Sequence, residues 1–345
     1  MPAWVIDKYG SNDVMRFNSN MVFPVINYPN EVIIKVHATS LNPIDVNMRI
    51  NTFLAFEDGE FPLVLGRDVS GVVMECGLNV RYFKPGDQVW GAIPPWKQGA
   101  LAEFVVTSGN EISMKPKSLS HTEAASLPYV TLTAWAALAN SCGLNKEKCP
   151  GKRVLIIGAS GGVGTAAIQL LKAWGAHVTA VCSEDAFTLI KSLGADDIVD
   201  YKAAQLSEQL KSQELFDVIL DNVGGETEKL AFQFLKPWSG ATYATLVTPF
   251  LYNNDRLGIA DGMMRTGVTL SSKVVKVTFT AHLIISFFMH FAHCTHLPKL
   301  PLIPFKLASL IRPVIDEIFS FSDVPNAFSK VEKGHARGKT VIKVT

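Results

Sequence analysis

Cysteine is scarce in this chain, and neither sign of charge is in clear excess. The five cysteines among 345 residues are scattered, odd in number and without a Cys-x-x-Cys pair. This usage is typical of free thiols in a reducing compartment and argues against a disulfide framework. Lysine plus arginine total 32 and aspartate plus glutamate total 31, so no bulk field attracts nucleic acid or an anionic membrane surface. We therefore expect no nucleic-acid partner and look for binding sites in local motifs.

The N-terminal residues lack the features of a targeting segment. Met1-Pro-Ala-Trp-Val-Ile-Asp7 is neither a secretory signal peptide nor an arginine-rich amphipathic transit segment. No presequence is therefore expected in the chain as written. A length of 345 residues suits about two domains, which gives room for a sizeable core.

The first third of the chain predicts short β-strands separated by turns. The apolar runs lie at 31–37, 69–74, 88–92 and 102–106. Their length and spacing are typical of a barrel. From Ser118 the pattern becomes helical, and Ser120-His-Thr-Glu123 has the composition of a capping box. The change from strand to helix periodicity predicts a domain boundary here.

The most informative motif is a glycine-rich turn between a strand and a helix. A β-branched and aliphatic run at 154–157 precedes Gly158, Gly161 and Gly164, and a helical pattern follows at 165–174. Glycine lacks the Cβ that would stop backbone from turning tightly, approaching a pyrophosphate and packing helix on strand. The N–H groups and the positive dipole end of the helix then face the phosphates. The residues predicted to bind a dinucleotide are Ser160, Gly161, Gly162, Val163 and Gly164.

Strands and helices alternate after this turn. The candidate strands lie at 154–158, 178–182, 197–201, 217–222, 241–246 and 268–272. The alternation predicts an α/β fold with a doubly wound parallel sheet of six strands in the order 3-2-1-4-5-6. Short strands then return around a helical stretch at 323–333, which is expected to close the first domain. The predicted division is 1–126 for the first domain, 127–308 for the nucleotide domain and 309–345 for the return.

Short motifs outside the glycine turn accompany it along the chain. They are Asn42-Pro-Ile-Asp45, 65–71 (Leu-Gly-Arg-Asp-Val-Ser-Gly), 84–89 (Lys-Pro-Gly-Asp-Gln-Val), 193–196 (Leu-Gly-Ala-Asp) and 334–339 (Gly-His-Ala-Arg-Gly-Lys). Together they resemble the medium-chain dehydrogenase/reductase superfamily, and within it the zinc-free quinone oxidoreductases. The resemblance implies a GroES-like β-barrel catalytic domain joined to a Rossmann domain. It also implies a mitochondrial oxidoreductase that transfers hydride from NADPH to a small quinone-type substrate and is linked to ubiquinone (coenzyme Q) biosynthesis.

Zinc ligands are missing where the zinc alcohol dehydrogenases of this superfamily carry them. Their cysteine ligand corresponds to Asn42, and their Gly-His-Glu motif corresponds to Gly66-Arg67-Asp68. No cysteine occurs between Cys76 and Cys142, so the structural zinc lobe is absent too. Without a Lewis acid, alcohol oxidation loses its main electrostatic support. We expect no metal, and we favour reduction of a quinone or an enone, which accepts hydride without one.

The end of the second strand of the nucleotide domain indicates which cofactor is used. An NAD site has an acidic residue at this position for the ribose 2′-hydroxyl, whereas this chain has Ser183. A small hydroxyl leaves room for a 2′-phosphate, and the resemblance adds Tyr201 as a phenolic donor. NADPH is therefore expected. Positive charge for the 2′-phosphate is assigned to Arg337, beside His335 and Ala336, although a surface arginine in a loop is the alternative.

Two further strand ends are expected to meet the nicotinamide half of the cofactor. Asn222 should contact the nicotinamide ribose, and backbone near Leu246 should contact the ring, because ligands of open α/β sheets bind at the carboxyl ends of the strands. In the substrate cleft, Asn42 and Asp45 are expected to make polar contacts and Arg67 to stabilise charge. A turn-capping role is the alternative for these polar side chains.

Two segments depart from the family pattern. The loop at 49–60 differs in composition at the expected substrate mouth, and residues 277–298 contain no Asp, Glu, Lys or Arg. For the second segment three interpretations remain open: a membrane span, a metal site, or packing in the interior or at a homodimer edge near 268–275. The candidate metal ligands are His290, His293, Cys294 and His296. Rival functions are an enone or enoyl-thioester reductase, with Asn47 at the position of a tyrosine proton donor, and a module that binds a reticulon-family membrane protein.

Overall fold

A computed structural model of the chain describes residues 1–50, 61–202, 206–247, 282–284 and 311–345. The chain divides into two units, Met1–Val130 with Cys294–Thr345, and Thr131–His293. Several features predicted from the sequence lie outside the described residues. They are the boundary at 308/309, most of the loop at 49–60, the strand at 268–272, the dimer edge at 268–275, the candidate metal ligands at 290–296 and, apart from 282–284, the segment 277–298.

The first unit contains two sheets. A three-stranded sheet has the order β2-β1-β4, and a seven-stranded sheet has the order β15-β16-β3-β5-β6-β8, with β7 paired to β3. The small sheet consists of β1 (Ala3–Ile6), β2 (Met15–Asn18) and β4 (Leu63–Val64). The large sheet consists of β3 (Glu31–Leu41), β5 (Asp68–Cys76), β6 (Gln88–Ala92), β7 (Phe104–Ser108), β8 (Ile112–Met114), β15 (Ile315–Ser320) and β16 (Lys339–Lys343).

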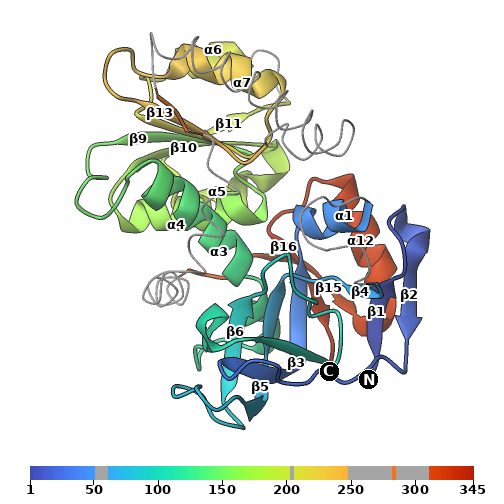
Figure 1. Cartoon of the computed structure of the whole chain (residues 1–345). Coiled ribbons are helices and arrows are strands. Elements are labelled where there is room, and N and C mark those ends of the chain that lie inside the picture. Colours follow the sequence, from blue (N-terminus) through green and yellow to red (C-terminus); the bar gives the residue numbers. More distant parts are fainter. Residues whose placement is uncertain (51–60, 203–205, 248–281, 285–310) are drawn as a thin grey trace, which may run out of the picture. The chain divides into compact units, whose positions relative to one another are not determined.

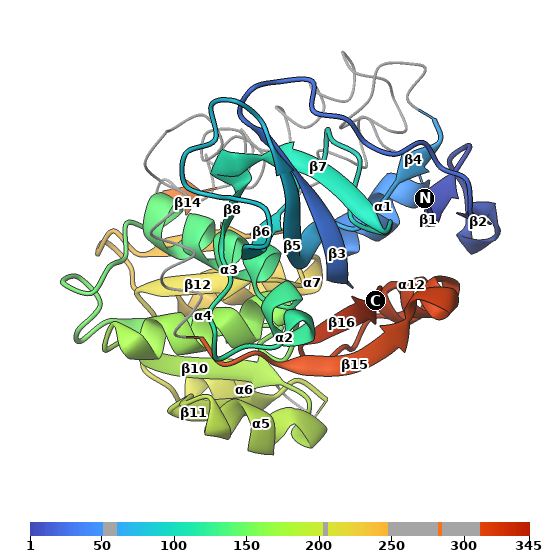
Figure 2. The same ribbon diagram turned by 90° about the horizontal axis from the view of Figure 1, so that it is seen from below.

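Strand β3 organises the large sheet because it pairs with β5, β7 and β16. Residues 31–35 pair with β7, and residues 38–41 pair with β16. The β3–β5 ladder shifts register twice along its length, and such bulges bend a strand and increase its twist. The strands of the sheet are accordingly twisted and bent (Figure 2), and aliphatic side chains from them form a buried core. The enclosed side chains include Val32, Ile34, Val36, Val69 and Val89.

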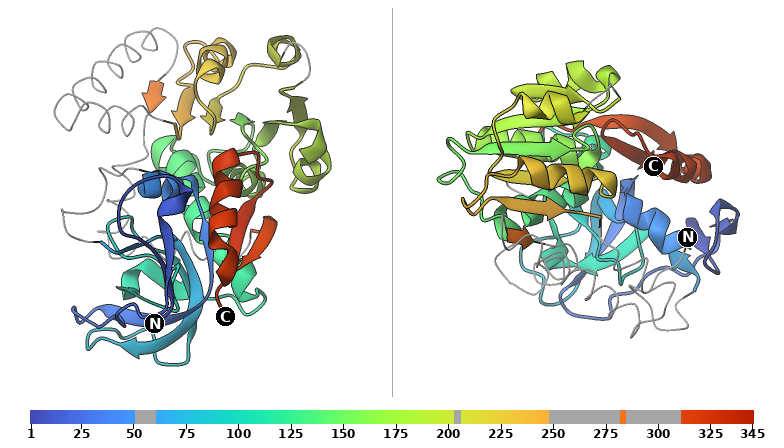
Figure 3. Two further views of the ribbon diagram at one scale, coloured as in Figure 1. Left: turned by 90° about the vertical axis from the view of Figure 1, so that its right-hand side faces the viewer. Right: turned by 90° about the horizontal axis from the view of Figure 1, so that it is seen from above.

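The described helices of the first unit pack on its large sheet or on one another. They are α1 (Pro43–Ile50), α2 (His121–Ala125) and α12 (Val324–Lys333). The predicted capping box is present, since Ser120 and Glu123 satisfy each other's backbone N–H groups at the start of α2. Helices α1 and α12 lie side by side (Figure 3). The guanidinium of Arg49 joins them, 5.7 Å from the ring centroid of Phe328 and 3.2 Å from the carboxylate of Glu332.

The second unit contains one parallel sheet in the order β11-β10-β9-β12-β13-β14. In chain order this is 3-2-1-4-5-6, so the predicted topology is confirmed. Its sixth strand is formed by 282–284, further along the chain than the predicted strand at 268–272. The strands are β9 (Arg153–Ile157), β10 (His177–Cys182), β11 (Asp197–Asp200), β12 (Val218–Asp221), β13 (Thr242–Thr245) and β14 (His282–Ile284).

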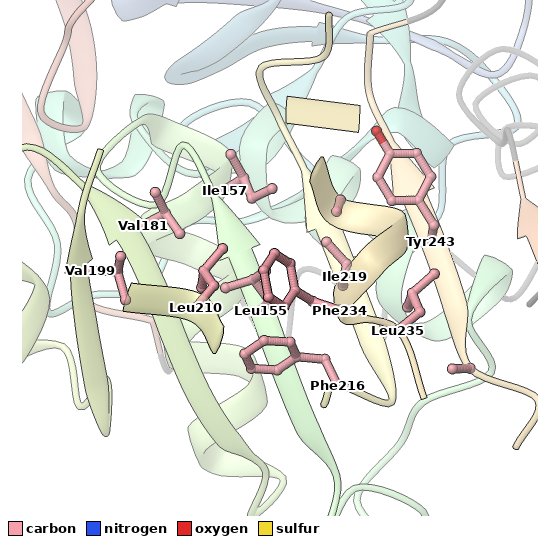
Figure 4. Packing of buried hydrophobic residues seen from close by; sticks show 12 residues of the cluster. Leu155, Ile157, Val181, Val199, Leu210, Phe216, Ile219, Phe234, Leu235 and Tyr243 are labelled. Carbon is pink, nitrogen blue, oxygen red and sulfur yellow. The ribbon is translucent and has the colours of Figure 1, made fainter. Parts of the chain in front are cut away.

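Helices cover both faces of this sheet. Helices α4 and α5 lie on one face, and α6 and α7 lie on the other (Figure 1). Their bounds are α4 (Gly162–Ala173), α5 (Phe187–Ser192), α6 (Leu206–Lys211) and α7 (Glu226–Ala231), and α3 (Pro128–Trp135) precedes them. Leu155, Ile157 and Ile219 from the central strands pack with side chains of α6 and α7 in one buried cluster (Figure 4). Burial on both faces explains the apolar runs that the sequence shows for these strands.

Candidate functional site

The glycine turn joins β9 to α4, and each of its spaced glycines meets a different constraint. Gly158 has φ +74°, a conformation that side chains with a Cβ rarely adopt. A Cβ on Gly161 would meet only the carbonyl oxygen of Gly158, 3.8 Å away. A Cβ on Gly164 would lie 2.5 Å from the carbonyl oxygens of Gly158 and Ala159. The turn therefore needs glycine for its bend, leaves open space at Gly161, and packs α4 directly onto backbone at Gly164.

The N-terminus of α4 is open to a ligand. The N-cap residue, Gly161, provides no side-chain hydrogen bond to the first turn of this 12-residue helix. The predicted phosphate-binding residues 160–163 are all partly exposed, whereas Gly164 is buried. Uncapped N–H groups at the positive end of a helix dipole bind anions. The residues present therefore fit the pyrophosphate of a dinucleotide.

Asn222 follows β12 and lies against the glycine turn. Its backbone N–H donates to the carbonyl oxygen of Ile157 at 3.1 Å, and its side-chain Nδ2 donates to the same oxygen at 3.0 Å. The Oδ1 atom is buried and accepts no hydrogen bond from the described residues. Since a buried acceptor is normally satisfied, this atom has unused capacity to accept a hydrogen bond. This geometry fits the predicted contact with the nicotinamide ribose.

Leu246 follows the neighbouring strand β13. Its backbone N–H donates to the carbonyl oxygen of Asp221 at 3.1 Å. This hydrogen bond places Leu246 beside Asn222 at the same carboxyl edge of the sheet. The structure thus brings together, within one unit, the residues predicted for the pyrophosphate and for the nicotinamide half.

The predicted 2′-phosphate residues lie at the ends of β10 and β11. The Ser183 hydroxyl donates to the carboxylate of Asp185, so an acidic group stands beside the expected phosphate. The backbone N–H of Tyr201 donates to the carbonyl oxygen of Cys182 at 3.2 Å, and the residue is 41% exposed. The Nζ atom of Lys202 lies 5.9 Å from the Tyr201 ring centroid. Lys202 is thus a cation at this position that the sequence analysis did not select.

The C-terminal residues predicted to bind the cofactor belong to the first unit. His335, Ala336 and Arg337 lie in the connection between α12 and β16, and His335 has a φ of 61°. His335 and Arg337 are both exposed. Their contact with the cofactor stays a prediction.

A buried polar cluster in the first unit contains the predicted substrate residue Asn42. The Nζ atom of Lys339 donates to the carbonyl oxygen of Leu41 at 2.9 Å and to Oδ1 of Asn42, and it lies 3.4 Å from Oδ2 of Asp68. Asp68 Oδ2 also accepts from Ser40 Oγ at 2.7 Å and from Asn42 Nδ2 at 2.9 Å. Burial lowers the pKa of Lys339, and the carboxylate of Asp68 opposes that shift. Both polar atoms of the Asn42 amide are therefore engaged within the protein.

Asp45 and Arg67 form a second buried pair. The Nε atom of Arg67 lies 3.7 Å from Oδ1 of Asp45, and both side chains are 0% exposed. Asp45 accepts from the backbone N–H groups of Asn42 and Gly66, each at 2.8 Å. The Arg67 guanidinium donates to the carbonyl oxygens of Val64, Pro94 and Lys97. Burial raises the pKa of Asp45, and Arg67 opposes the shift. These contacts give both side chains a positioning role in the unit, and the predicted direct contact with substrate has no support in them.

The zinc positions implied by the resemblance can be tested against this geometry. Asn42 and Asp68 already accept hydrogen bonds from a buried ammonium, and Arg67 brings a second buried cation. Protein zinc sites use cysteine, histidine and carboxylate ligands. The residues present therefore do not fit a catalytic zinc ion. Within the described part of the chain, no group of three or more His, Cys, Asp or Glu side chains could hold a metal ion either.

Comparisons with known proteins identify the family. Residues 28–117 match the alcohol dehydrogenase GroES-like domain, and residues 193–342 match the zinc-binding dehydrogenase family. NAD(P)H oxidoreductase RTN4IP1, mitochondrial, from Homo sapiens is 63% identical over 357 aligned positions, which cover 100% of this chain and 89% of that protein. The chain belongs to the medium-chain dehydrogenase/reductase superfamily. Its expected GroES-like and Rossmann domains are confirmed, and it is an NAD(P)H oxidoreductase of this superfamily.

Two other members of the superfamily are also similar. The 2-methylene-furan-3-one reductase of Solanum lycopersicum is 35% identical and covers 99% of this chain and 79% of that protein. The structure of the quinone oxidoreductase from Coxiella burnetii matches with a TM-score of 0.76 and 30% identity, covering 100% of this chain and 99% of that chain. The human relative is named as a mitochondrial protein, in agreement with the predicted location. Within the described residues, no helix has both the length and the apolar character to cross a membrane.

Proposed function

We propose that the chain is an NADPH-dependent, zinc-independent reductase of a quinone-type acceptor. The main support for the proposal is the cluster of Lys339, Asp68 and Asn42. Its buried ammonium contacts the side-chain oxygen atoms of Asp68 and Asn42, which stand at the positions of zinc ligands. The similarity to the Coxiella burnetii quinone oxidoreductase supports the choice of acceptor. A quinone accepts hydride directly and one proton from solvent, and so becomes a hydroquinone without a Lewis acid.

The nucleotide unit supplies orientation. When bound, the reduced nicotinamide supplies the hydride. The N-terminus of α4 would hold the pyrophosphate, and Oδ1 of Asn222 would accept a hydroxyl of the nicotinamide ribose. Held in this way, the cofactor loses rotational and translational freedom before the reaction, and this positioning is a major source of rate enhancement.

The proposed preference for NADPH over NADH rests on Ser183, Tyr201 and Lys202. Ser183 leaves space for the 2′-phosphate, and Tyr201 adds a phenolic donor. The ammonium of Lys202 lies 5.9 Å from the Tyr201 ring centroid. The carboxylate of Asp185, which accepts from the Ser183 hydroxyl, opposes a dianionic phosphate. We expect the lysine to offset this carboxylate. Arg337 remains a second proposed cation.

An activity assay tests the proposal. NADPH oxidation is followed with a short-chain ubiquinone analogue, with a cyclic enone and with a crotonyl thioester, and NADP⁺ reduction is followed with primary alcohols. We expect turnover with the quinone, none with the alcohols, and no loss of activity after treatment with a metal chelator. NADPH oxidation with the thioester but not with any quinone would instead establish an enoyl reductase.

One observation favours the enone reductase as the second candidate. The tomato relative is named as a reductase of 2-methylene-furan-3-one, an enone. Such a reaction needs a proton donor near the substrate, and the position considered for a tyrosine holds Asn47 on the exposed side of α1. An amide is a poor proton donor, so the quinone remains our first choice.

A role in mitochondrial ubiquinone biosynthesis is part of the same proposal. Cells without the chain should contain less ubiquinone, and the wild-type chain should restore the amount whereas a variant unable to bind NADPH should not. Restoration by such a variant would favour the reticulon-binding module. The homodimer and the reticulon-family partner stay predictions.

A further inference from the structure

A buried carboxylate at the end of β12 accepts hydrogen bonds from the turn that follows it, from helix α7 and from strand β13. Asp221 is 0% exposed. Its Oδ1 atom accepts from the backbone N–H groups of Val223 at 2.9 Å and Gly224 at 3.0 Å. Its Oδ2 atom accepts from the hydroxyls of Thr227 and Tyr243, each at 2.8 Å. Hydrogen bonds to an ionised group are roughly twice as strong as neutral ones, so this carboxylate fixes its surroundings firmly.

Tyr243 couples the carboxylate to the core. Its ring belongs to the buried cluster beneath α6 and α7 and lies 4.8 Å from the ring centroid of Phe232. Figure 4 shows its hydroxyl at the end of the ring away from Phe234 and Leu235. Burial raises the pKa of Tyr243, and the neighbouring carboxylate of Asp221 adds to the shift. The phenol therefore stays protonated and donates a hydrogen bond to Oδ2 of Asp221.

The same network reaches both residues predicted for the nicotinamide half. Asn222 directly follows Asp221, and the turn after it is held by the Asp221 carboxylate. Leu246 donates its backbone N–H to the carbonyl oxygen of Asp221 at 3.1 Å. Gly224 completes the turn with φ +71°, and a Cβ there would lie 2.8 Å from Cβ of Val247. The turn after β12 therefore packs closely on the end of β13, and the Leu246 hydrogen bond holds the two together.

We propose that Asp221, Tyr243 and Thr227 form a positioning network that holds Asn222 and Leu246 for the nicotinamide-ribose half of the cofactor. The inference deepens the proposed function and rests on its reduced nicotinamide ligand. The adenosine half is expected at the ends of β10 and β11, which the network does not contact through any of its hydrogen bonds described above. The two halves should therefore respond differently to loss of the network.

The test is the Tyr243→Phe variant, which removes only the hydroxyl and keeps the ring in the core. Binding of NADPH is compared with binding of adenosine 2′,5′-bisphosphate, which contains the adenosine half and lacks nicotinamide. We expect the Kd for NADPH to rise about tenfold, or about 1.4 kcal/mol, and the Kd for the bisphosphate to change less than about twofold. A merely structural role would move both constants or neither, and either result would overturn the proposal.

Phe232→Leu is the matched control, because it alters packing on the same ring while leaving the hydroxyl-to-carboxylate hydrogen bond in place. It should lower the unfolding temperature and leave the ratio of the two dissociation constants unchanged. If Tyr243→Phe does not fold, Thr227→Val removes another donor from Asp221 and should shift the ratio in the same direction. Failure of the wild-type protein to bind either ligand would refute the proposed function itself, whereas normal wild-type binding with an unchanged ratio in the variants refutes only the network.

Discussion

Substitution of two glycines in the turn after β9 should separate cofactor binding from fold stability. Gly161 and Gly164 are three residues apart, yet a Cβ at the first would meet only one atom, 3.8 Å away, whereas a Cβ at the second would lie 2.5 Å from two backbone oxygens. Gly161 also has φ −73° and ψ 173°, which alanine adopts without strain. Alanine at Gly161 therefore fits the free protein, and alanine at Gly164 does not.

The expected magnitudes differ accordingly. Gly161→Ala replaces an N-cap glycine by alanine and should cost at most about 1 kcal/mol of unfolding free energy. Its methyl group occupies the space through which a pyrophosphate would approach, so the Kd for NADPH should rise at least about tenfold, or about 1.4 kcal/mol. Gly164→Ala overpacks backbone and should cost about 1–3 kcal/mol, partly offset by about 1 kcal/mol of helix propensity.

Urea unfolding and fluorescence titration with NADPH measure the two effects on the same samples. Gly161→Ala should show a nearly unchanged unfolding midpoint with weakened binding, and Gly164→Ala should show a lowered midpoint. A folded Gly161→Ala variant that binds NADPH as tightly as the wild-type protein would refute this prediction, because the phosphates would then approach elsewhere.

Three further predictions concern charge. The rings of His37 and His121 stack with centroids 4.4 Å apart, and burial, with His37 and Lys115 nearby, lowers the pKa of His121 to about 4. Because the unfolded state then binds more protons than the folded state, the free energy of unfolding should fall as the pH drops from about 6.5 towards 4. The expected fall is about 1–2 kcal/mol after allowance for partial exposure. Urea unfolding at pH 7.5 and 5 should show a smaller fall for His121→Gln than for the wild-type protein. Lys202→Glu should weaken NADPH binding and leave NADH binding nearly unchanged by titration, and equal loss for both cofactors would contradict a role at the 2′-phosphate. Lys339→Met should cost about 3–5 kcal/mol because it leaves Asp68 buried without its cation, and a double-mutant cycle with Asp68→Asn should show a smaller combined loss than the sum of the single losses.

The nucleotide domain was predictable because its signals are local. The strand before Gly158, the helix after Gly164 and the alternation that follows are each encoded within a few residues, and they determine the order of the sheet. Glycine spacing also predicts the turn, since each position has a separate steric reason. The position of the sixth strand was harder to predict, because a run of apolar residues without charges has no periodicity that marks where a strand begins.

The polar clusters were not predictable from local pattern, since each joins residues far apart in the chain. Lys339 stands 271 positions from Asp68, and nothing in the run Gly-Lys-Thr-Val-Ile marks its lysine as buried. Tyr243 lies in the short strand Thr-Tyr-Ala-Thr, and this pattern does not indicate which group its hydroxyl contacts. A signal was nevertheless present: a charged or phenolic side chain inside a segment predicted to be a buried strand requires a polar partner.

That requirement connects the two polar clusters with the chemistry proposed for the protein. A buried carboxylate at the position of a zinc ligand, with neither a metal ion nor hydrogen-bond donors beside it, would destabilise the folded state. In this chain the ammonium of Lys339, together with Ser40, Asn42 and the backbone N–H of Tyr129, satisfies Asp68. The first unit thereby keeps its buried carboxylate hydrogen-bonded without a metal ion. This agrees with the proposed reaction, in which the acceptor takes hydride without a Lewis acid and the placement of the nicotinamide matters most. The network around Asp221 is suited to provide that placement.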